Sequence, residues 1–471
     1  MTIFRMTEMI RRGELTSTEL VSRYISIIEA NRRLNAVIEL NPDAPEIAAR
    51  LDAGLREVRG TAADHTETDR TAADGRGFGA NNFGPLYGVP ILIKDNINTG
   101  DRMHTSAGSV ALAGNIAPED APVVRLLREA GAVILGKTNM TEFANYMSDA
   151  MPNGYSSRGG QTLNYINPDA DPSGSSTGSA VAVAAGLCAA AIGTETCGSI
   201  ISPSLCAGIV GIKPTIGLVS SSGVIPISFT LDTPGPMTSC VEDAALLLGV
   251  MTGRHYETRH YEMRHNETDC GSGLAGLRIG VCRIIREECT AEWIEANEYL
   301  IDIMSGLGAE CIDLPEHGIY TGFIGAIMHN EFRTGLNEYL KSMSNPSIPQ
   351  NLAQIIAYNE SHAATALKYG QNVLIRDETG GGLDDPEYLE AMAEREAAVL
   401  AFDSLFDEFG IDVFFMPETN CALAAATGFP SITIPICKMT NGLPIGSFFI
   451  ARRYDESLLL RVAHEIEYTL K

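Results

Sequence analysis

The sequence lacks three features that would point to common functions. No Cys-x-x-Cys pair occurs among its ten cysteines, so zinc binding and thioredoxin-type chemistry receive no support. Most cysteines stand in apolar surroundings, which is typical of reduced thiols inside a cytoplasmic protein. Positive charge is also scarce, because 34 lysines and arginines face 59 acidic residues, for a formal net charge of -25. We therefore expect neither nucleic acid nor an anionic membrane as a partner.

A long apolar run is the third missing feature. The longest one, Ala180–Ile192, is too short to span a bilayer and predicts a buried helix. The N-terminal residues Met1–Glu8 carry charge without an apolar run after it, so they do not resemble a signal peptide. We therefore expect a cytoplasmic protein. With 45% apolar residues among 471, the chain is long enough to bury a large core.

Local patterns predict an α/β fold. Thr16–Glu19 fits a capping box and is followed by apolar residues on one helical face. Farther along, Val89–Lys94 is a short apolar strand, Asp120 is expected to cap a helix that ends at Ala130, and Ala132–Leu135 is the next strand. This alternation predicts a parallel or mixed sheet covered by helices. Further strands are expected at Leu277–Val281, Asp412–Met416, Ser431–Ile434 and Ile445–Ile450, and further helices at Pro45–Val58, Glu292–Ser305, Ile324–Met343, Pro386–Phe409 and Glu456–Tyr468.

Two segments look like additions at the surface. Residues 60–82 are rich in Gly, Ala, Thr and Asp without a hydrophobic period, which predicts a flexible insertion. Gly75–Ala80 inside it loosely fits a dinucleotide-binding motif, but no apolar strand precedes it. Arg254–Thr268 repeats five residues three times, with a histidine in each copy. Because five residues turn a helix by roughly 140°, the histidines would not share a face, so we expect a surface connector over 251–273 rather than a metal site.

Two clusters of small residues indicate a possible reaction site. Asp171–Ala180 and Gly193–Ile200 flank an apolar helix that must be buried, which argues against a mere flexible linker. Small residues allow close backbone approach, and a row of backbone N–H groups can bind an oxyanion. Ser176 also stands at the centre of a Gly-x-Ser-x-Gly pattern. That nucleophile elbow needs a preceding strand and a later catalytic histidine, but no strand is evident and His464 fits an amphipathic helix.

An ordered set of motifs carries a resemblance to a known family. Each motif alone is weak, whereas the set in this order is highly specific. The motifs are Leu86–Ile97, Gly136–Ala144, Gly174–Ser179, Gly193–Ser199, Gly211–Thr215, Leu231–Met237, Gly428–Pro435 and Gly442–Gly446. From about residue 15 to residue 467, the chain resembles the amidase signature family. Within that family, Gly159–Thr162, Gly193–Ser199 and Val224–Ser228 are most similar to bacterial peptide amidases.

The resemblance implies a catalytic triad of two serines and a lysine. Carried over position by position, Ser199 is the nucleophile, Ser175 is the bridging serine and Lys94 is the base. The family has a cis peptide bond before the bridging serine, which predicts one between Gly174 and Ser175.

The resemblance also implies an oxyanion hole, formed by the backbone N–H groups of Thr196, Cys197, Gly198 and Ser199. Two departures from the family occur here. Cys197 replaces a glycine, and its N–H can still donate provided the backbone needs no positive φ. Its thiol is another conceivable nucleophile, but no histidine is placed to activate it. Ile201 replaces the usual arginine, so a substrate carboxylate would find no cation at this apolar position.

The lysine of such a triad must be neutral to accept a proton. An exposed lysine is charged at neutral pH, whereas burial among apolar neighbours lowers its pKa. Residues 89–93 supply such neighbours directly before Lys94. The plainer alternative is an ion pair between Lys94 and Asp95, which would keep the lysine charged. We therefore expect the Asp95 carboxylate to point away from Lys94.

The sequence thus predicts an amidase that hydrolyses a carboxamide to a carboxylic acid and ammonia or an amine, without a metal or an organic cofactor. Its partner would be a small-molecule or peptide amide, and Tyr146, Gln161 and Ile201 are candidate substrate-binding residues. The main alternative is the glutaminase component of a tRNA-dependent amidotransferase, its A subunit, which the missing arginine at position 201 disfavours. The intact triad disfavours an inactive binding protein. A homodimer stays open.

The family resemblance further implies an α/β/α sandwich with a central mixed, mostly parallel sheet. We expect a single amidase domain over residues 1–471. Its expected parts are N-terminal helices at 1–60, the flexible insertion at 60–82, a catalytic core at 86–250, the surface connector at 251–273 and a C-terminal half at 274–471 that completes the sheet and the substrate pocket.

Overall fold

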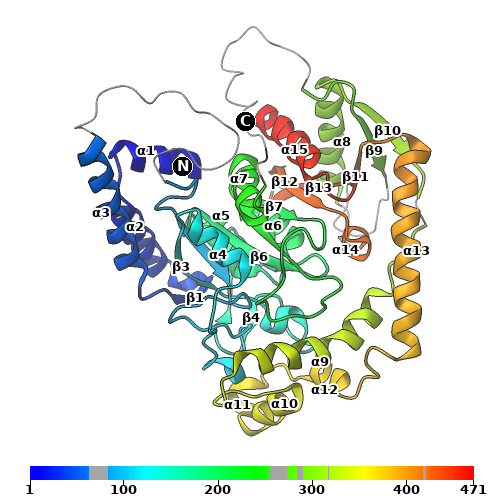
Figure 1. Cartoon of the computed structure of the whole chain (residues 1–471). Helices are drawn as coiled ribbons and strands as arrows, with labels where there is room; N and C mark the ends of the chain where they lie inside the picture. Colours follow the sequence, from blue (N-terminus) through cyan, green and yellow to red (C-terminus); the bar gives the residue numbers. More distant parts are fainter. Residues whose placement is uncertain (63–82, 255, 257–272, 284–289, 317, 417–420) are drawn as a thin grey trace.

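The computed structural model describes residues 1–62, 83–254, 256, 273–283, 290–316, 318–416 and 421–471 (Figure 1). The insertion expected at 60–82, with its dinucleotide-like motif, and the histidine repeat at 254–268 lie almost wholly outside these residues. Their predictions are therefore not tested.

One large sheet organises the molecule. Within the described residues, eleven strands form it in the order β1-β3-β2-β6-β8-β7-β12-β13-β11-β9-β10 (Figure 1). The strands are β1 Val37–Leu40, β2 Pro90–Lys94, β3 Val133–Thr138, β6 Ala190–Glu195, β7 Val210–Lys213, β8 Thr233–Thr238, β9 Arg278–Cys282, β10 Glu310–Leu314, β11 Val413–Met416, β12 Ser431–Lys438 and β13 Pro444–Ala451. A separate ribbon pairs β4 Tyr155–Ser156 with β5 Gly160–Gln161.

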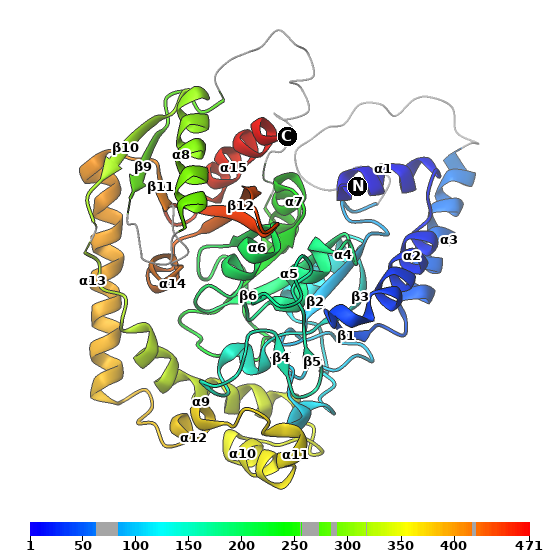
Figure 2. The ribbon, with the colours of Figure 1, turned by 180° about the vertical axis from the view of Figure 1, so that it is seen from behind.

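Helices cover the sheet in two groups. The α-helices are α1 Ile3–Arg12, α2 Ser17–Ala30, α3 Ala44–Ala62, α4 Pro122–Glu129, α5 Thr177–Ala184, α6 Ile201–Ala207, α7 Val241–Thr252, α8 Ala291–Gly306, α9 Ile324–Met343, α10 Leu352–Ser361, α11 Ala363–Ala366, α12 Asn372–Glu378, α13 Pro386–Phe409, α14 Ala422–Thr427 and α15 Glu456–Leu470. One group is the pair α5 and α6, which pack on the central strands, and the other joins α4, α7, α15 and α8. Helices α9 to α12 lie together beyond the sheet, and α13 runs along one side of the molecule (Figures 1 and 2).

The α/β sandwich with a mixed sheet is confirmed, but the expectation of a mostly parallel sheet is wrong. Six of the ten strand pairings are antiparallel and four are parallel. The reason lies in connections without a crossover helix. The segment between β7 and β8 contains none, so β8 inserts between β6 and β7 and runs against both. The short turn between β12 and β13 makes an antiparallel hairpin.

Most local predictions are confirmed, with two corrections. The Thr16 capping box is present, and α9 and α13 have the predicted bounds. Asp120 does not cap α4, because its carboxylate instead accepts a hydrogen bond from the Gly100 N–H and pairs with Arg128. The apolar run Ala180–Ile192 is not one helix, since α5 ends at Ala184 and β6 begins at Ala190. Among the described residues, no helix combines the length and apolarity that a membrane crossing requires.

The packing of α5 makes one glycine indispensable. A Cβ on Gly178 would overlap the backbone carbonyl oxygens of Asn139 and Ala36, which belong to the backbone beside β3 and β1. The close approach also brings the Gly178 N–H within 3.0 Å of the Asn139 carbonyl oxygen, to which it donates. Helix α5, which begins two residues after Ser175, can therefore sit this deep only because residue 178 has no side chain.

We expect Gly178→Ala to lower the free energy of unfolding by roughly 1–3 kcal/mol, because backbone must move to admit the methyl group. Urea denaturation measures the change. Gly306→Ala at the end of α8 is the matched control, since a Cβ there meets no atom within 4 Å. If both variants have the stability of the parent chain, the close packing of α5 is refuted.

Candidate active site

Lys94 ends β2 in the middle of the sheet. Strands β3 and β6 flank β2 in parallel, and the lysine side chain is completely buried. Its Nζ lies 2.8 Å from Ser175 Oγ, 2.9 Å from Thr194 Oγ1 and 3.2 Å from the Thr194 carbonyl oxygen. Burial lowers the pKa of Lys94 to about 7, although the negative charges of Asp232 and Glu195 oppose the shift. A neutral amine at physiological pH is therefore accessible at this position.

Asp95 turns away from the lysine, as expected. Its carboxylate accepts hydrogen bonds from the Gly108 N–H at 2.9 Å and from Arg158 Nη1 at 3.2 Å, and also from Ser106 Oγ. Ser106 and Gly108 belong to the loop after β2, whereas Arg158 reaches Asp95 from the turn between β4 and β5, and none of these contacts involves Lys94. The alternative of a Lys94–Asp95 ion pair is therefore wrong.

Ser175 stands where the loop from residue 162 enters α5. The peptide bond between Gly174 and Ser175 is cis, as the family resemblance implied. The Ser175 carbonyl oxygen accepts from the Thr141 N–H at 3.2 Å, and the Ser175 side chain is fully buried. The structure thus brings Ser175 and Lys94 into direct contact from segments 81 positions apart.

The turn between β6 and α6 carries Ser199. Glu195, the last residue of β6, accepts hydrogen bonds on Oε2 from the N–H groups of Ile200 at 2.7 Å and Ile201 at 3.0 Å. The Ser199 carbonyl oxygen accepts from the Ser176 N–H at 3.2 Å, which ties this turn to the start of α5. Ser199 therefore lies in a turn that is fastened at both ends, next to the segment of Ser175.

The four residues of the expected oxyanion hole form this same turn. Gly198 has a φ of 82°, whereas Cys197 is absent from the non-glycine residues with positive φ, so the cysteine needs no glycine-like backbone. Thr196 Oγ1 donates to Asp232 Oδ1 at 2.5 Å. Asp232 Oδ2 in turn accepts from the N–H groups of Ile227 at 2.8 Å and Ser228 at 3.1 Å. One buried carboxylate thus fixes the turn to the segment before β8, and burial raises its pKa to about 6.

The two rival nucleophiles have poor settings. Ser176 Oγ donates to the Thr194 carbonyl oxygen at 3.0 Å and accepts from the Thr194 N–H at 3.2 Å, so its hydroxyl serves the backbone. No strand precedes Gly174 directly, as a nucleophile elbow requires. Cys197 is an exposed residue, but desolvation of its thiol within the turn and the negative charge of Glu195 both raise its pKa, which disfavours the reactive thiolate.

The three candidate substrate residues lie apart. Tyr146 is buried, packs edge-on against Phe332 with 5.0 Å between ring centroids, and accepts at its hydroxyl from Arg376 Nη2 at 3.1 Å. Ile201 is fully buried in a hydrophobic cluster with Leu205. Their contact with substrate stays a prediction.

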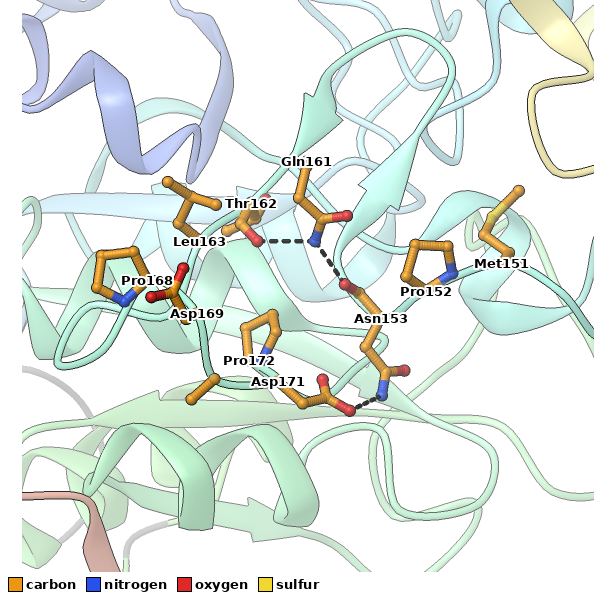
Figure 3. A pocket seen from close by; sticks show the side chains of 11 residues that line it. Met151, Pro152, Asn153, Gln161, Thr162, Leu163, Pro168, Asp169, Asp171 and Pro172 are labelled. Carbon is orange, nitrogen blue, oxygen red and sulfur yellow. Dashed lines mark hydrogen bonds between the residues drawn. The ribbon is translucent and has the colours of Figure 1, made fainter. Parts of the chain in front are cut away.

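Gln161 lines a pocket of about 550 Å³ (Figure 3). Its Nε2 donates to the carbonyl oxygens of Asn153 at 2.7 Å and Thr162 at 2.9 Å, and Figure 3 also shows the hydrogen bond from Asn153 to Asp171. The lining comes from residues 151–153, 161–163 and 168–172 and includes no member of the predicted triad. This pocket therefore lies beside the loop that leads to Ser175, and Lys94, Ser175 and Ser199 do not line it.

Sequence reasoning missed the carboxylates that hold the site together. Glu195 and Asp232 are both buried and both accept backbone N–H groups. Each stands inside a motif that had been singled out, Gly193–Ser199 and Leu231–Met237. The sequence does place each acid next to a strand that is expected to be buried. Because an unpaired buried charge is costly, this position indicates that each carboxylate has hydrogen-bond partners. Their partners could not be read from the sequence.

Comparisons with known proteins support the motif-based resemblance. A family model described as Amidase matches residues 60–423. The chain is 36% identical to the peptide amidase of Stenotrophomonas maltophilia, whose X-ray structure matches with a TM-score of 0.85 over 100% of this chain and 96% of that one. It is 34% identical to a probable amidase of Arabidopsis thaliana, over 96% of this chain and 86% of the relative. It is 33% identical to the A subunit of the glutamyl-tRNA(Gln) amidotransferase of Methanococcoides burtonii, over 82% of this chain and 85% of the relative.

The role of Glu195 in the turn can be tested by stability. We expect Glu195→Ala to lower the free energy of unfolding by about 2 kcal/mol, because it leaves the N–H groups of Ile200 and Ile201 without their acceptor. Glu195→Gln should lose less, since an amide oxygen can still accept. Urea denaturation ranks the three proteins, and an alanine variant as stable as the glutamine variant would show that the acceptor does not matter.

Proposed function

Because this chain belongs to the amidase family and is a hydrolase of amide C–N bonds, we propose that it works through an acyl-enzyme on Ser199. The observation that carries the proposal is the contact of 2.8 Å between Lys94 Nζ and Ser175 Oγ in a completely buried setting. A lysine with a pKa of about 7 is neutral for a large share of the time at physiological pH. It can therefore act as a general base, which an ordinary lysine cannot.

The first half-reaction forms the ester bond to Ser199 and breaks the C–N bond, while one proton from Ser199 ends on the leaving nitrogen by way of Ser175 and Lys94. Ser199 Oγ attacks the carbonyl carbon of the amide while its proton passes to Ser175 Oγ, and the Ser175 proton passes to Lys94 Nζ. The tetrahedral intermediate then collapses with cleavage of the C–N bond. The proton returns from Lys94 through Ser175 to the departing nitrogen, which leaves as ammonia or an amine. General acid–base assistance of this kind contributes roughly 10²–10⁴-fold to the rate.

The second half-reaction uses water in place of Ser199. Lys94 and Ser175 take a proton from the water as its oxygen attacks the ester carbonyl, and they return it to Ser199 Oγ as the acid leaves. The route needs no metal or organic cofactor, because the chain supplies the base, the relay and the nucleophile.

The oxyanion hole is proposed on the turn that Asp232 and Glu195 hold. The negative oxygen of the intermediate would accept from the N–H groups of Thr196, Cys197 and Gly198, together with that of Ser199. The carboxylates fix the turn before substrate arrives, so the donors need not reorganise during the reaction. Each such donor is worth roughly 10²–10³-fold in rate.

The proposed substrate is the C-terminal carboxamide of a peptide, and ammonia is the leaving group. Support comes from the similarity to a bacterial peptide amidase over the whole length of this chain. Ile201 also places a buried apolar side chain directly after the nucleophile turn, where a charged acyl group such as that of free glutamine finds no cation. This disfavours a glutaminase function, although a protein of the tRNA-dependent amidotransferases is a relative.

We expect Ser199→Ala to fold normally and to lose amide hydrolysis by about 10³-fold or more, because no other group can form the acyl-enzyme. Ammonia release from an acetylated peptide amide measures the rate. A fluorophosphonate probe should label Ser199, and peptide mapping identifies the labelled residue. The exposed Ser222→Ala variant is the control, and labelling of Ser176 in the parent enzyme would contradict the assignment.

The pH dependence tests Lys94. Because only the neutral amine accepts a proton, kcat/KM should rise with pH through one ionisation near 7 and stay high in the alkaline range. Lys94→Ala should remove this ionisation and most of the rate. Lys94→Arg should be equally damaging, since guanidinium is not deprotonated in proteins. The exposed Lys341→Arg variant should keep the parent profile, and a nearly normal Lys94→Arg enzyme would mean that position 94 acts only as a positive charge.

A further inference from the structure

Arg395 is a partly buried guanidinium that lacks a polar partner among the described residues. It stands on α13, and its Nε is buried without a hydrogen bond. No ion pair joins it to a described acid, whereas Arg452 pairs with Asp403 and Asp407 farther along the same helix. A buried donor without an acceptor costs free energy, so its retention calls for a role.

The neighbours of Arg395 add positive charge. Its Nη2 would lie 3.3 Å from a Cβ on Gly428, and the next residue, Phe429, has the guanidinium of Arg453 above its ring at 5.7 Å. Burial lowers the pKa of Arg395, and the charge of Arg453 lowers it further. The positive charge of Arg395 also acts on Lys213. Burial lowers the pKa of Lys213 to about 8, and the charge of Arg395 lowers it further.

Glu331 is the carboxylate whose charge acts most strongly on Arg395, and it already accepts hydrogen bonds from other groups. Glu331 on α9 raises the pKa of Arg395, but its oxygens accept from Ser228 Oγ, from the Thr230 N–H at 3.1 Å and hydroxyl, and from the Tyr388 hydroxyl at 2.8 Å. It makes no ion pair with Arg395 within 4.0 Å. The guanidinium therefore keeps its hydrogen-bonding capacity for another anion.

The Arg395 guanidinium lies near the C-terminal end of β7, because its Nη2 lies beside Gly428, whose carbonyl oxygen accepts from the Ile216 N–H at 3.1 Å just after that strand. Strands β6 and β7 both run antiparallel to β8, so their C-terminal ends point in the same direction. Glu195 is the last residue of β6, and Lys213 is the last residue of β7. Two strand spacings separate β6 from β7, which is roughly 10 Å. The positive charge of Lys213 also acts on the thiol of Cys197 in the Ser199 turn. Helix α14, Ala422–Thr427, spans the distance from the Ser199 turn to Arg395: a Cβ on Gly198 would lie 3.4 Å from Cys421 Cβ at its start, and Arg395 lies beside Gly428 at its end. Arg395 is therefore roughly 10 Å from that turn, which a glutamate side chain on the residue before the reacting carboxamide can bridge.

We propose that Arg395 binds a carboxylate on the acyl part of the substrate, which makes the enzyme selective for amidated peptides with an acidic side chain before the terminal residue. This inference rests on the proposed function. A guanidinium can hold a carboxylate with two parallel hydrogen bonds, and the contact is strong where water is largely excluded. The carboxylate would be recognised away from the reacting carbon, consistent with the apolar Ile201 next to the nucleophile turn.

Three acetylated dipeptide amides test the proposal, identical except for Glu, Met or Lys before the amidated residue. The parent enzyme should show kcat/KM for ammonia release about tenfold or more higher with Glu than with Met, the size expected for a hydrogen bond to a charged group. Arg395→Met should lose this preference, and Arg395→Glu should favour the Lys peptide instead. The control Arg452→Gln removes the positive charge of another arginine, one that pairs with acids of α13, and should keep the preference for Glu.

Each contrary result has a distinct meaning. Hydrolysis of all three peptides by the parent enzyme without a preference for Glu overturns the role of Arg395 and leaves the peptide amidase function standing. A preference that survives in Arg395→Met, or that falls equally in Arg452→Gln, also overturns it, because general charge would then explain the selectivity. If the parent enzyme hydrolyses none of the three, the proposed peptide substrate fails and the inference about Arg395 fails with it.

Discussion

The rest of the site depends on keeping a lysine inside the sheet without an acid in contact. Lys94 would regain its charge if a carboxylate met its amine, and it would be exposed if β2 lay at an edge. Flanking parallel strands provide the burial. Arg158 and the N–H of Gly108 occupy the carboxylate of Asp95, the nearest acid in sequence. Desolvation of the Lys94 amine therefore outweighs the negative charges of Asp232 and Glu195 and lowers the pKa of Lys94 to about 7.

Buried carboxylates fasten the separate parts of this architecture to one another. Glu195 holds the start of α6, Asp232 joins Thr196 to residues 227 and 228, and Glu331 holds residues 228 and 230 from α9. Each acid accepts from backbone N–H, so its charge is satisfied without a basic side chain in contact. These hydrogen bonds connect the Ser199 turn to α9 without a break.

The sequence predicted those features that depend on neighbours along the chain. Five apolar residues before Lys94 indicated its burial, and the motif set identified the family and with it the cis bond before Ser175. The sequence did not predict contacts between segments that lie far apart along the chain. Asp232 meets Thr196 across 36 positions and Glu331 meets Ser228 across 103, and no local pattern encodes either pair. The mostly parallel sheet failed for the same reason, because the insertion of β8 between β6 and β7 is a long-range choice.

The strand order has a consequence for the chain as it leaves the ribosome. β7 gains its second neighbour only when β12 pairs with it, and β12 comes near the end of the sequence. Synthesis therefore completes Lys94, Ser175 and Ser199 long before their sheet can close on that side. Until then the nascent chain presents β7 as an unpaired edge, which is a template for association with other strands. A chain that ends before β12 keeps this open edge, so we expect it to associate more readily than the full chain.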